Sequence, residues 1–153
     1  MTIKRIVSLL IRRHGTNNPF HIAAQKNIIV LFEPLGHMMG YFNTYKRIPM
    51  IHINSCMDEH DQHYTCAHEL GHAIQHRRVN TPFLHRHTLQ SIAKIEREAN
   101  EFAVELLIPD ELLLGGSTIY EAAKVCGVPE EIAHLKQAPK TNFWRDEQSF
   151  FKL

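Results

Sequence analysis

The sequence predicts an α+β fold in which a small antiparallel three-stranded sheet packs with several helices. Three short β-rich runs lie between residues 28 and 54 and are separated by turn residues. Apolar residues at helical spacing precede these runs and dominate the chain after them. With 153 residues and 44% apolar content, the chain is long enough for one hydrophobic core and too short for two ordinary domains. We therefore expect a single domain over residues 1–153.

The N-terminal third predicts two helices followed by three strands. Helical spacing of apolar residues predicts a first helix over residues 3–14, which Gly15 ends, and Asn18-Pro19 can start a second helix through Gln25. The β-rich runs that follow are residues 28–32, 39–43 and 50–54. Because these runs are adjacent in the chain, we expect them to form the antiparallel sheet.

The next predicted helix, at about residues 59–77, carries the sequence HELGH at residues 68–72. Side chains four apart lie on nearly the same face of a helix, so His68 and His72 can both bind one ion. With a third protein ligand, a zinc ion keeps a coordination position for water, and Glu69 lies where it can accept that water's proton. This is the HExxH arrangement of zinc peptidases. It predicts a Zn²⁺ cofactor, against the alternative of a histidine-rich surface helix without an ion.

Residues around the motif narrow the class of zinc site. The metzincin pattern requires histidine and glycine at the positions of Arg78 and Gln75, so it does not fit. His76 continues the four-residue spacing but lies about 80° around the helix from His68, which favours the solvent edge of the helix over a ligand role. Gly71 costs helix stability relative to alanine, so its presence predicts the close approach of another element beside the metal.

A second amphipathic helix, predicted within residues 95–109, offers the third ligand. Glu96 borders the apolar stripe of this helix and is the better ligand candidate, whereas Glu98 lies about 160° away on ideal geometry. Asn100 shares the face of Glu96 and is placed to hydrogen-bond a ligand imidazole. The solvated face of the helix is predicted to carry Glu98, Glu101 and Glu105.

Three stretches of the chain together resemble the ImmA/IrrE family of metallopeptidases. They are IHIN at residues 51–54, QHYTCAHELGH at 62–72 and EREANEFAVELLIP at 96–109. The resemblance implies a thermolysin-like zincin fold, with His68, His72 and Glu96 as zinc ligands and Glu69 as the general base. It also implies that the substrate is a helix-turn-helix transcriptional repressor of a phage or mobile element, whose cleavage relieves repression.

Analogy with thermolysin-like peptidases also suggests where a substrate binds. The strand at residues 50–54 is a candidate edge strand for an extended substrate, and Pro49 at its start is compatible with an edge. An ordinary sheet strand without a ligand is an equally good interpretation. The candidate donors to the oxyanion of the tetrahedral intermediate are His52, Tyr64, Tyr41 and Tyr45, and the sequence does not choose among them.

The C-terminal part predicts a helix-turn-helix-like segment. We expect a catalytic core at residues 1–112, two capped helices at 113–137 and a tail at 138–153. The second of these helices opens with Pro129-Glu130-Glu131, acidic where a DNA-reading helix meets phosphates, which favours packing or repressor recognition over direct nucleic-acid binding. The rival interpretation is a non-proteolytic regulator that binds a repressor or DNA through these helices and holds zinc structurally. An open coordination position argues against a structural ion.

The charge balance and the cysteine content limit the kinds of partner and the cell compartment that the sequence allows. The 17 basic and 16 acidic residues create no overall field for nucleic acid, and the clusters Arg12-Arg13-His14 and His76-Arg77-Arg78 are too short to change this. Three cysteines without CxxC spacing fit a reducing cytosol rather than a disulfide framework. The sequence has no signal peptide pattern and no run near the roughly 20 apolar residues of a membrane span, so we expect a cytoplasmic protein.

Overall fold

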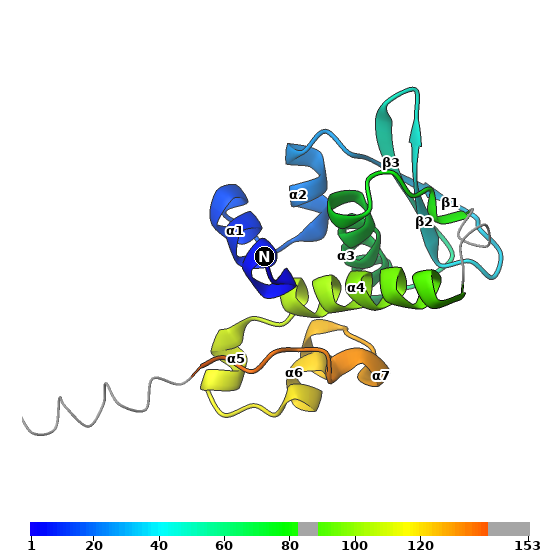
Figure 1. The fold of residues 1–153 in the computed structure, drawn as a ribbon. Coiled ribbons are helices and arrows are strands. Elements are labelled where there is room, and N and C mark those ends of the chain that lie inside the picture. Colours follow the sequence, from blue (N-terminus) through cyan, green and yellow to red (C-terminus); the bar gives the residue numbers. More distant parts are fainter. Residues whose placement is uncertain (83–88, 141–153) are drawn as a thin grey trace, which may run out of the picture.

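The computed structural model describes residues 1–82 and 89–140. The elements are α1 (Ile3–His14), α2 (Pro19–Gln25), β1 (Ile29–Glu33), β2 (Gly40–Tyr45), β3 (Ile48–Asn54), α3 (Glu59–Gln75), α4 (Leu89–Leu107), α5 (Asp110–Leu114), α6 (Ile119–Cys126) and α7 (Glu130–Ala133). The long helix α4 separates two groups: α1–α3 and the sheet lie on one side, and α5–α7 lie on the other (Figure 1). Among the described residues, no helix is both long and apolar enough to span a membrane.

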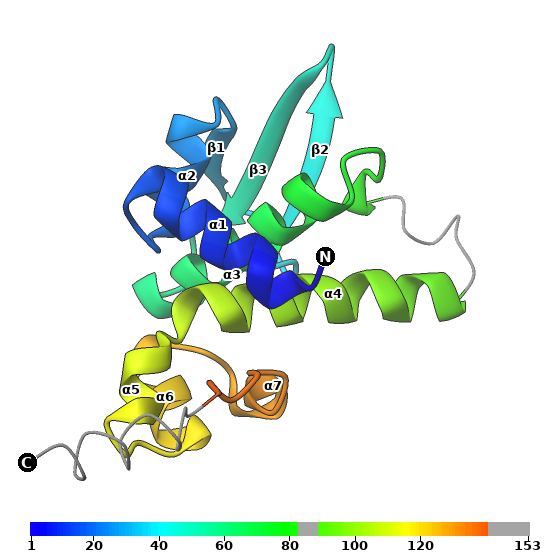
Figure 2. The same cartoon turned by 60° about the vertical axis from the view of Figure 1, so that its left-hand side comes forward.

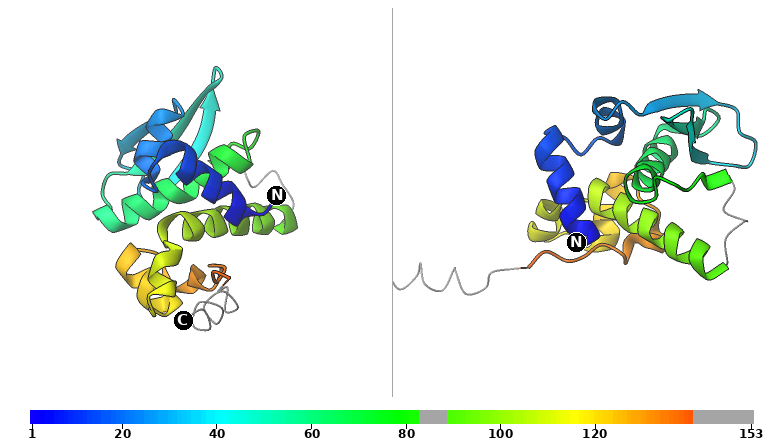
Figure 3. Two further views of the ribbon diagram at one scale, coloured as in Figure 1. Left: turned by 90° about the vertical axis from the view of Figure 1, so that its left-hand side faces the viewer. Right: turned by 45° about the horizontal axis from the view of Figure 1, so that its top comes forward.

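The first two helices begin and end at the residues that the sequence predicts. The Thr2 side chain caps the start of α1, and Gly15 ends this helix in the left-handed conformation with a φ of 70°. Asn18 caps α2 by accepting a hydrogen bond from the Phe20 amide, and Pro19 occupies the first helical position. α1 lies beside α4, as the two views of Figure 3 show.

The sheet is mixed, so the prediction of a fully antiparallel sheet is wrong. The strand order is β1-β3-β2, and β3 pairs in parallel with β1 and antiparallel with β2. β2 and β3 form a hairpin around Lys46 and Arg47, whereas the chain leaves β1 and crosses to the far edge before it returns. The crossover over residues 34–47 meets the need of a parallel pair for a connection of about a dozen residues or more.

β3 is the central strand, so the candidate edge strand for a substrate is wrong and the alternative of an ordinary sheet strand holds. β2 is an edge strand, and residues that follow α3 bind part of its outer side. The Thr81 hydroxyl accepts a hydrogen bond from the Phe42 amide at 2.7 Å and donates one to the Phe42 carbonyl at 3.1 Å. The Asn80 side-chain oxygen accepts from the Thr44 amide at 3.1 Å. A substrate strand added here would have to displace these side chains.

The core lies between the sheet, α3 and α4. Its fully buried side chains include Phe42, Ile51, Ile53, Leu70, Phe102 and Leu106. A Cβ atom on Gly71 would lie 3.1 Å from atoms of the Phe102 side chain, so the close approach predicted from this glycine is confirmed and the approaching element is α4. Figure 2 shows α3 lying between the sheet and α4. This packing fixes which faces of α3 and α4 meet.

The C-terminal segment contains the two predicted helices, but the side-chain cap predicted for the second is absent. α6 begins with a capping box in which Thr118 and Glu121 bind each other's backbone amides, and it ends at Gly127 with a φ of 71°. α7 has four residues, and Pro129 gives it no side-chain cap. One helical turn is too short to lie along a DNA groove as a recognition helix does. Of the predicted tail, residues 141–153 lie outside the described residues.

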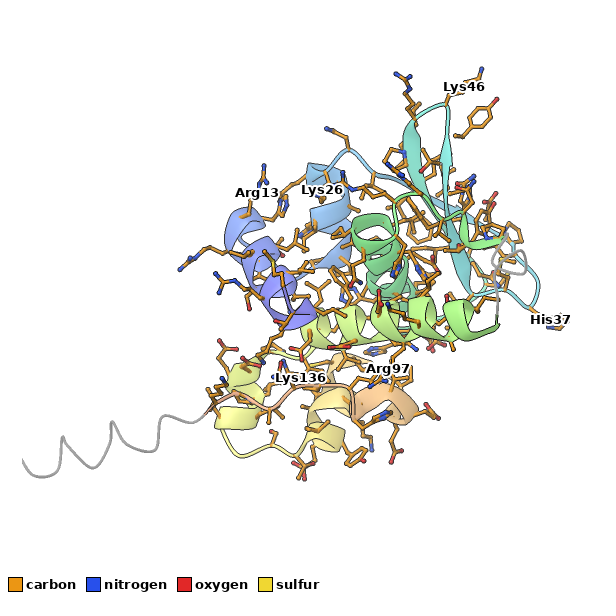
Figure 4. The ribbon with its side chains drawn as sticks, viewed as in Figure 1. Arg13, Lys26, His37, Lys46, Arg97 and Lys136 are labelled. Atoms are coloured by element: carbon orange, nitrogen blue, oxygen red, sulfur yellow. The ribbon has the colours of Figure 1, made fainter. Side chains whose placement is uncertain are left out.

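A buried charge cluster joins this C-terminal part to α4 and α1. Lys136 Nζ lies 2.9 Å from Glu105 Oε2 and 2.7 Å from Asp110 Oδ1, and Lys4 Nζ lies 2.9 Å from the same Asp110 oxygen. Glu105 is therefore buried, and its predicted place on a solvated face is wrong because the returning chain covers it. Figure 4 shows Lys136 at this junction below α4.

Candidate metal centre

The α3 helix brings the two motif histidines together. His68 and His72 lie one turn apart, with 3.2 Å between their Nε2 atoms. His72 is fully buried and His68 is partly buried. Burial lowers the pKa of His72, which favours the neutral imidazole that binds metals.

Glu96 reaches these histidines from α4. Its Oε1 atom lies 3.1 Å from His72 Nε2, and its Oε2 atom lies 3.3 Å from His68 Nε2. Neighbouring ligands of a tetrahedral ion with bonds of about 2.0–2.1 Å are separated by about 3.3–3.4 Å. Burial would raise the pKa of Glu96, but hydrogen bonds from His68 and His72 outweigh this effect and lower it, so the carboxylate is charged. The donor set and its spacing therefore fit a tetrahedral metal ion.

Glu69 is the second carboxylate beside the histidines. It is 5% exposed, and its Oε2 atom is buried without a hydrogen-bond partner among the described residues. Ligand atoms of His68, Glu69 and His72 lie within 4.8 Å of one another. Burial raises the pKa of Glu69 to about 7, although His68 opposes the rise. A buried carboxylate oxygen left unpaired is costly, so this atom is available to a water or substrate group at the metal centre.

Asn100 accepts hydrogen bonds from both His68 and Tyr64, on the Nδ1 side of the His68 ring. Asn100 Oδ1 lies 2.8 Å from His68 Nδ1, so Nδ1 carries a proton and donates it; once Nε2 gives up its own proton, its lone pair is free to bind an ion in place of the hydrogen bond to Glu96. The Tyr64 hydroxyl donates to the same Asn100 oxygen at 2.8 Å. Burial and the charges of Glu96 and Glu69 raise the pKa of Tyr64, which keeps it a donor. The predicted hydrogen bond of Asn100 to a motif imidazole is present.

His76 and Glu98 lie next to the centre in a way that helix geometry alone did not predict. His76 Nδ1 lies 3.0 Å from His72 Nδ1, and His76 Nε2 lies 2.8 Å from Glu98 Oε2. The His76 side chain is 9% exposed, so its predicted place at the solvent edge of the helix is wrong. Its contact with α4 depends on how the two helices cross, which neither helical pattern specifies.

The four candidate oxyanion donors separate into one residue at the centre and three on the sheet. Tyr64 contacts Asn100 and lies one turn before His68. His52 is bound by Glu33 and by Asn43, and Tyr41 stacks on its ring with centroids 4.1 Å apart. The remaining candidate is Tyr45, which is exposed beside the hairpin turn.

Comparison with known proteins identifies the family. The model of the IrrE N-terminal-like domain, family Peptidase_M78, matches residues 23–137. The chain belongs to this family. It is 44% identical over 139 residues to "Uncharacterized immunity region protein 2" of Bacillus phage phi105, covering 88% of each chain. It is 35% identical over 113 residues to "Metallopeptidase ImmA" of Bacillus subtilis (strain 168), covering 72% of this chain and 66% of that protein.

Family membership confirms two predictions made from the sequence. The predicted resemblance to ImmA/IrrE proteins is confirmed, and this chain is a metallopeptidase. The comparisons do not assign roles to individual residues, and the geometry of His68, Glu69, His72 and Glu96 now gives the basis for assigning them.

Proposed function

We propose that this protein is a zinc-dependent endopeptidase in which His68, His72 and Glu96 hold the ion and Glu69 is the general base. The observation that carries this proposal is the convergence of three metal-binding side chains at 3.1–3.3 Å from one another. Two imidazoles and one carboxylate in tetrahedral spacing suit zinc and leave a fourth position open. A structural zinc site would be closed by a fourth protein ligand.

The chemistry follows from the position of Glu69. A bound zinc ion lowers the pKa of a water molecule and polarises the scissile carbonyl. Glu69 accepts the proton of the attacking water and then donates it to the leaving amine. A group that must accept and return a proton works best with a pKa near the ambient pH, and burial moves the pKa of Glu69 in that direction. Asn100 holds His68 in the tautomer that this arrangement needs.

The substrate we propose is a helix-turn-helix transcriptional repressor of a phage or mobile element. The ImmA/IrrE resemblance supports this choice, and so does the phage relative whose name places it in an immunity region. In this proposal residues 1–112 form the catalytic core, and residues 113–137 pack on it or help to recognise the repressor. The acidic start of the four-residue α7 argues against DNA contact through these helices.

The main test compares two variants in which a glutamate of α3 is replaced by glutamine. Glu69→Gln should retain zinc but slow cleavage of the repressor encoded beside the protein by at least about 100-fold, because it removes the proton acceptor. Glu59→Gln, at the exposed start of α3, is the matched control and should cleave normally. Cleavage is followed by gel electrophoresis and zinc by metal analysis.

A chelator separates this proposal from a non-proteolytic regulator. Repressor fragments that disappear when a chelator is added support the peptidase. Intact repressor released from its operator, with equal effect from Glu69→Gln and the parent protein, would support the regulator instead.

A further inference from the structure

Four basic side chains from separate parts of the chain line one cavity of about 540 Å³. They are Arg13 in α1, Lys26 after α2, Arg47 in the β2–β3 turn and Arg77 after α3. We refer to the space between these four residues as the cationic cavity. Its volume lies within the range of about 300–1,000 Å³ that is usual for ligand pockets. None of the residues that line it is Asp or Glu.

Two of the basic side chains in this cavity come from short clusters that do not predict a binding site from the sequence alone. Arg13 belongs to the cluster Arg12-Arg13-His14, and Arg77 belongs to His76-Arg77-Arg78. Figure 4 shows Arg13 and Lys26 at neighbouring outer ends of α1 and α2, on the side of the molecule where the hairpin with Lys46 extends. Each cluster is small, but the folded chain places one arginine from each beside Lys26 and Arg47.

The positive charge of the cavity is not neutralised by the part of the chain that the structure describes. None of the ion pairs between described residues involves Arg13, Lys26, Arg47 or Arg77. Burial lowers the pKa of Lys26, and the charges of Arg77 and Arg13 lower it further. Like charges held this close favour the binding of an anion.

The hairpin turn provides an independent sign of function. Lys46 has a φ of 48° and Arg47 a φ of 67°, in the left-handed region. Two-residue turns of this kind strongly prefer Asn-Gly, because side chains such as lysine and arginine are strained there. Backbone strain of this kind collects at functional sites. Here the strained turn places the Arg47 side chain at the cavity.

The cavity and the candidate metal centre lie on different faces of the same helix. Ala73 lines the cavity, and on ideal geometry it points about 100° around α3 from His72. Thr44 of the edge strand β2 lines the cavity as well. A protein substrate is large enough to contact both sites at once, which favours a segment of the substrate over an unrelated ligand.

We propose that the cationic cavity binds an acidic segment of the protein substrate, outside the metal centre. Arginine guanidinium groups pair with carboxylates through two parallel hydrogen bonds, and three of the four cations are arginines. The buried side chains of Ile28, Phe42 and Ala73 supply an apolar floor for the methylene groups of such a segment. A nucleic-acid backbone is the competing anion, but the cations surround one cavity rather than form a stripe along the surface. The proposal rests on the proposed peptidase function.

The test measures binding without turnover. In the full chain carrying Glu69→Gln, fluorescence anisotropy follows a fluorescein-labelled octaglutamate peptide, an uncharged Gly-Ser peptide of equal length, and a thymidine octanucleotide. Arg77→Glu should weaken octaglutamate binding by about tenfold or more, because it replaces an attraction with a repulsion. Arg47→Asn should weaken binding by about fivefold while it raises the unfolding temperature, because asparagine tolerates the left-handed turn. Lys124→Glu, on the exposed surface of α6, makes the same charge change as Arg77→Glu and should have little effect.

The outcomes separate this proposal from the proposed function. Absence of octaglutamate binding, equal weakening by Lys124→Glu, or tighter binding of the octanucleotide would each overturn the acidic-segment proposal. These measurements do not depend on cleavage, so they stand even where the protein proves inactive. In the active chain, Arg77→Glu should raise the KM for the repressor and leave kcat nearly unchanged. An unchanged KM would reject the cavity as a substrate site and leave the peptidase intact.

Discussion

Two carboxylates of α4 lie nine residues apart and have different surroundings. Glu96 faces the imidazoles of His68 and His72, and its side chain is 39% exposed. Glu105 is 2% exposed, accepts hydrogen bonds from Lys136 Nζ at 2.9 Å and from the Gln137 amide at 2.7 Å, and lies 3.6 Å from Lys4. The same residue type on one helix thus serves two purposes, which are set by its partners.

The difference lies in what each partner supplies. The ammonium groups of Lys136 and Lys4 bring the positive charge that a buried carboxylate needs, so Glu105 is satisfied within the fold. In their neutral forms, the imidazoles bring lone pairs and no net charge, so Glu96 and its two histidines together can bind a cation. In α4, the carboxylate paired with lysine therefore stabilises the fold, whereas the carboxylate that converges with two histidines is a candidate metal ligand.

Matched glutamine variants should give the largest contrast between these two carboxylates. Glu105→Gln should lower the free energy of unfolding by about 3 kcal/mol, because it leaves Lys136 buried with Asp110 as its remaining partner. Glu96→Gln should change the stability of the metal-free protein by less than about 1 kcal/mol but should abolish stoichiometric zinc binding. Urea unfolding in a chelator and metal analysis measure the two effects. Zinc loss in Glu105→Gln and not in Glu96→Gln would reverse the assignment.

A smaller effect is expected from Asn100, which hydrogen-bonds the proposed ligand His68 and is not itself a proposed ligand. Asn100→Ala should weaken zinc binding by about 10- to 100-fold, because His68 loses the acceptor that fixes its ring. Tyr64→Phe removes the other hydrogen bond of the Asn100 oxygen and leaves its contact with His68 in place. Zinc affinity is measured by competition with a chromophoric chelator. A larger loss in Tyr64→Phe than in Asn100→Ala would place the orienting role on the tyrosine.

The contrast between these regions also explains what the sequence could predict. The pattern places His68 and His72 on one face of α3, and Glu96 and Asn100 on one face of α4, because helical periodicity is a local property. Gly71 even indicates where the two helices approach each other. The residues of the candidate centre could therefore be selected before the fold was known.

The misplaced residues are those whose surroundings come from distant parts of the chain. Glu105 lies on the polar side of its own helix, and nothing in that pattern shows that Lys136 returns to cover it. Alternating apolar residues mark β3 as a strand, but they do not show that it lies between β1 and β2. The cationic cavity has the same origin, since Arg13 and Arg77 meet through tertiary packing alone.

The smallest predicted effect concerns Asp110, at the partly exposed border of the Glu105 cluster, and depends on pH. Burial would raise the pKa of Asp110, but hydrogen bonds from Lys136 and Lys4 outweigh burial and lower it. A lowered pKa in the folded state stabilises the protein above the ordinary pKa of about 4, and this stabilisation is lost as the pH falls further. Asp110→Asn should therefore reduce stability at pH 7 by less than about 1 kcal/mol, since the side chain is 35% exposed, and the difference should shrink below pH 4.

Urea unfolding of the metal-free protein between pH 3 and pH 7 measures this dependence, with Glu111→Gln at the exposed neighbouring position as the control. A constant difference across the range would mean that Asp110 acts through helix packing and not through its charge. In that case Glu105 alone would neutralise Lys136, and the cost of Glu105→Gln should rise toward about 5 kcal/mol. The pH series thus tests whether the cluster shares its charge between two carboxylates, as Glu96 shares two histidines at the other end of α4.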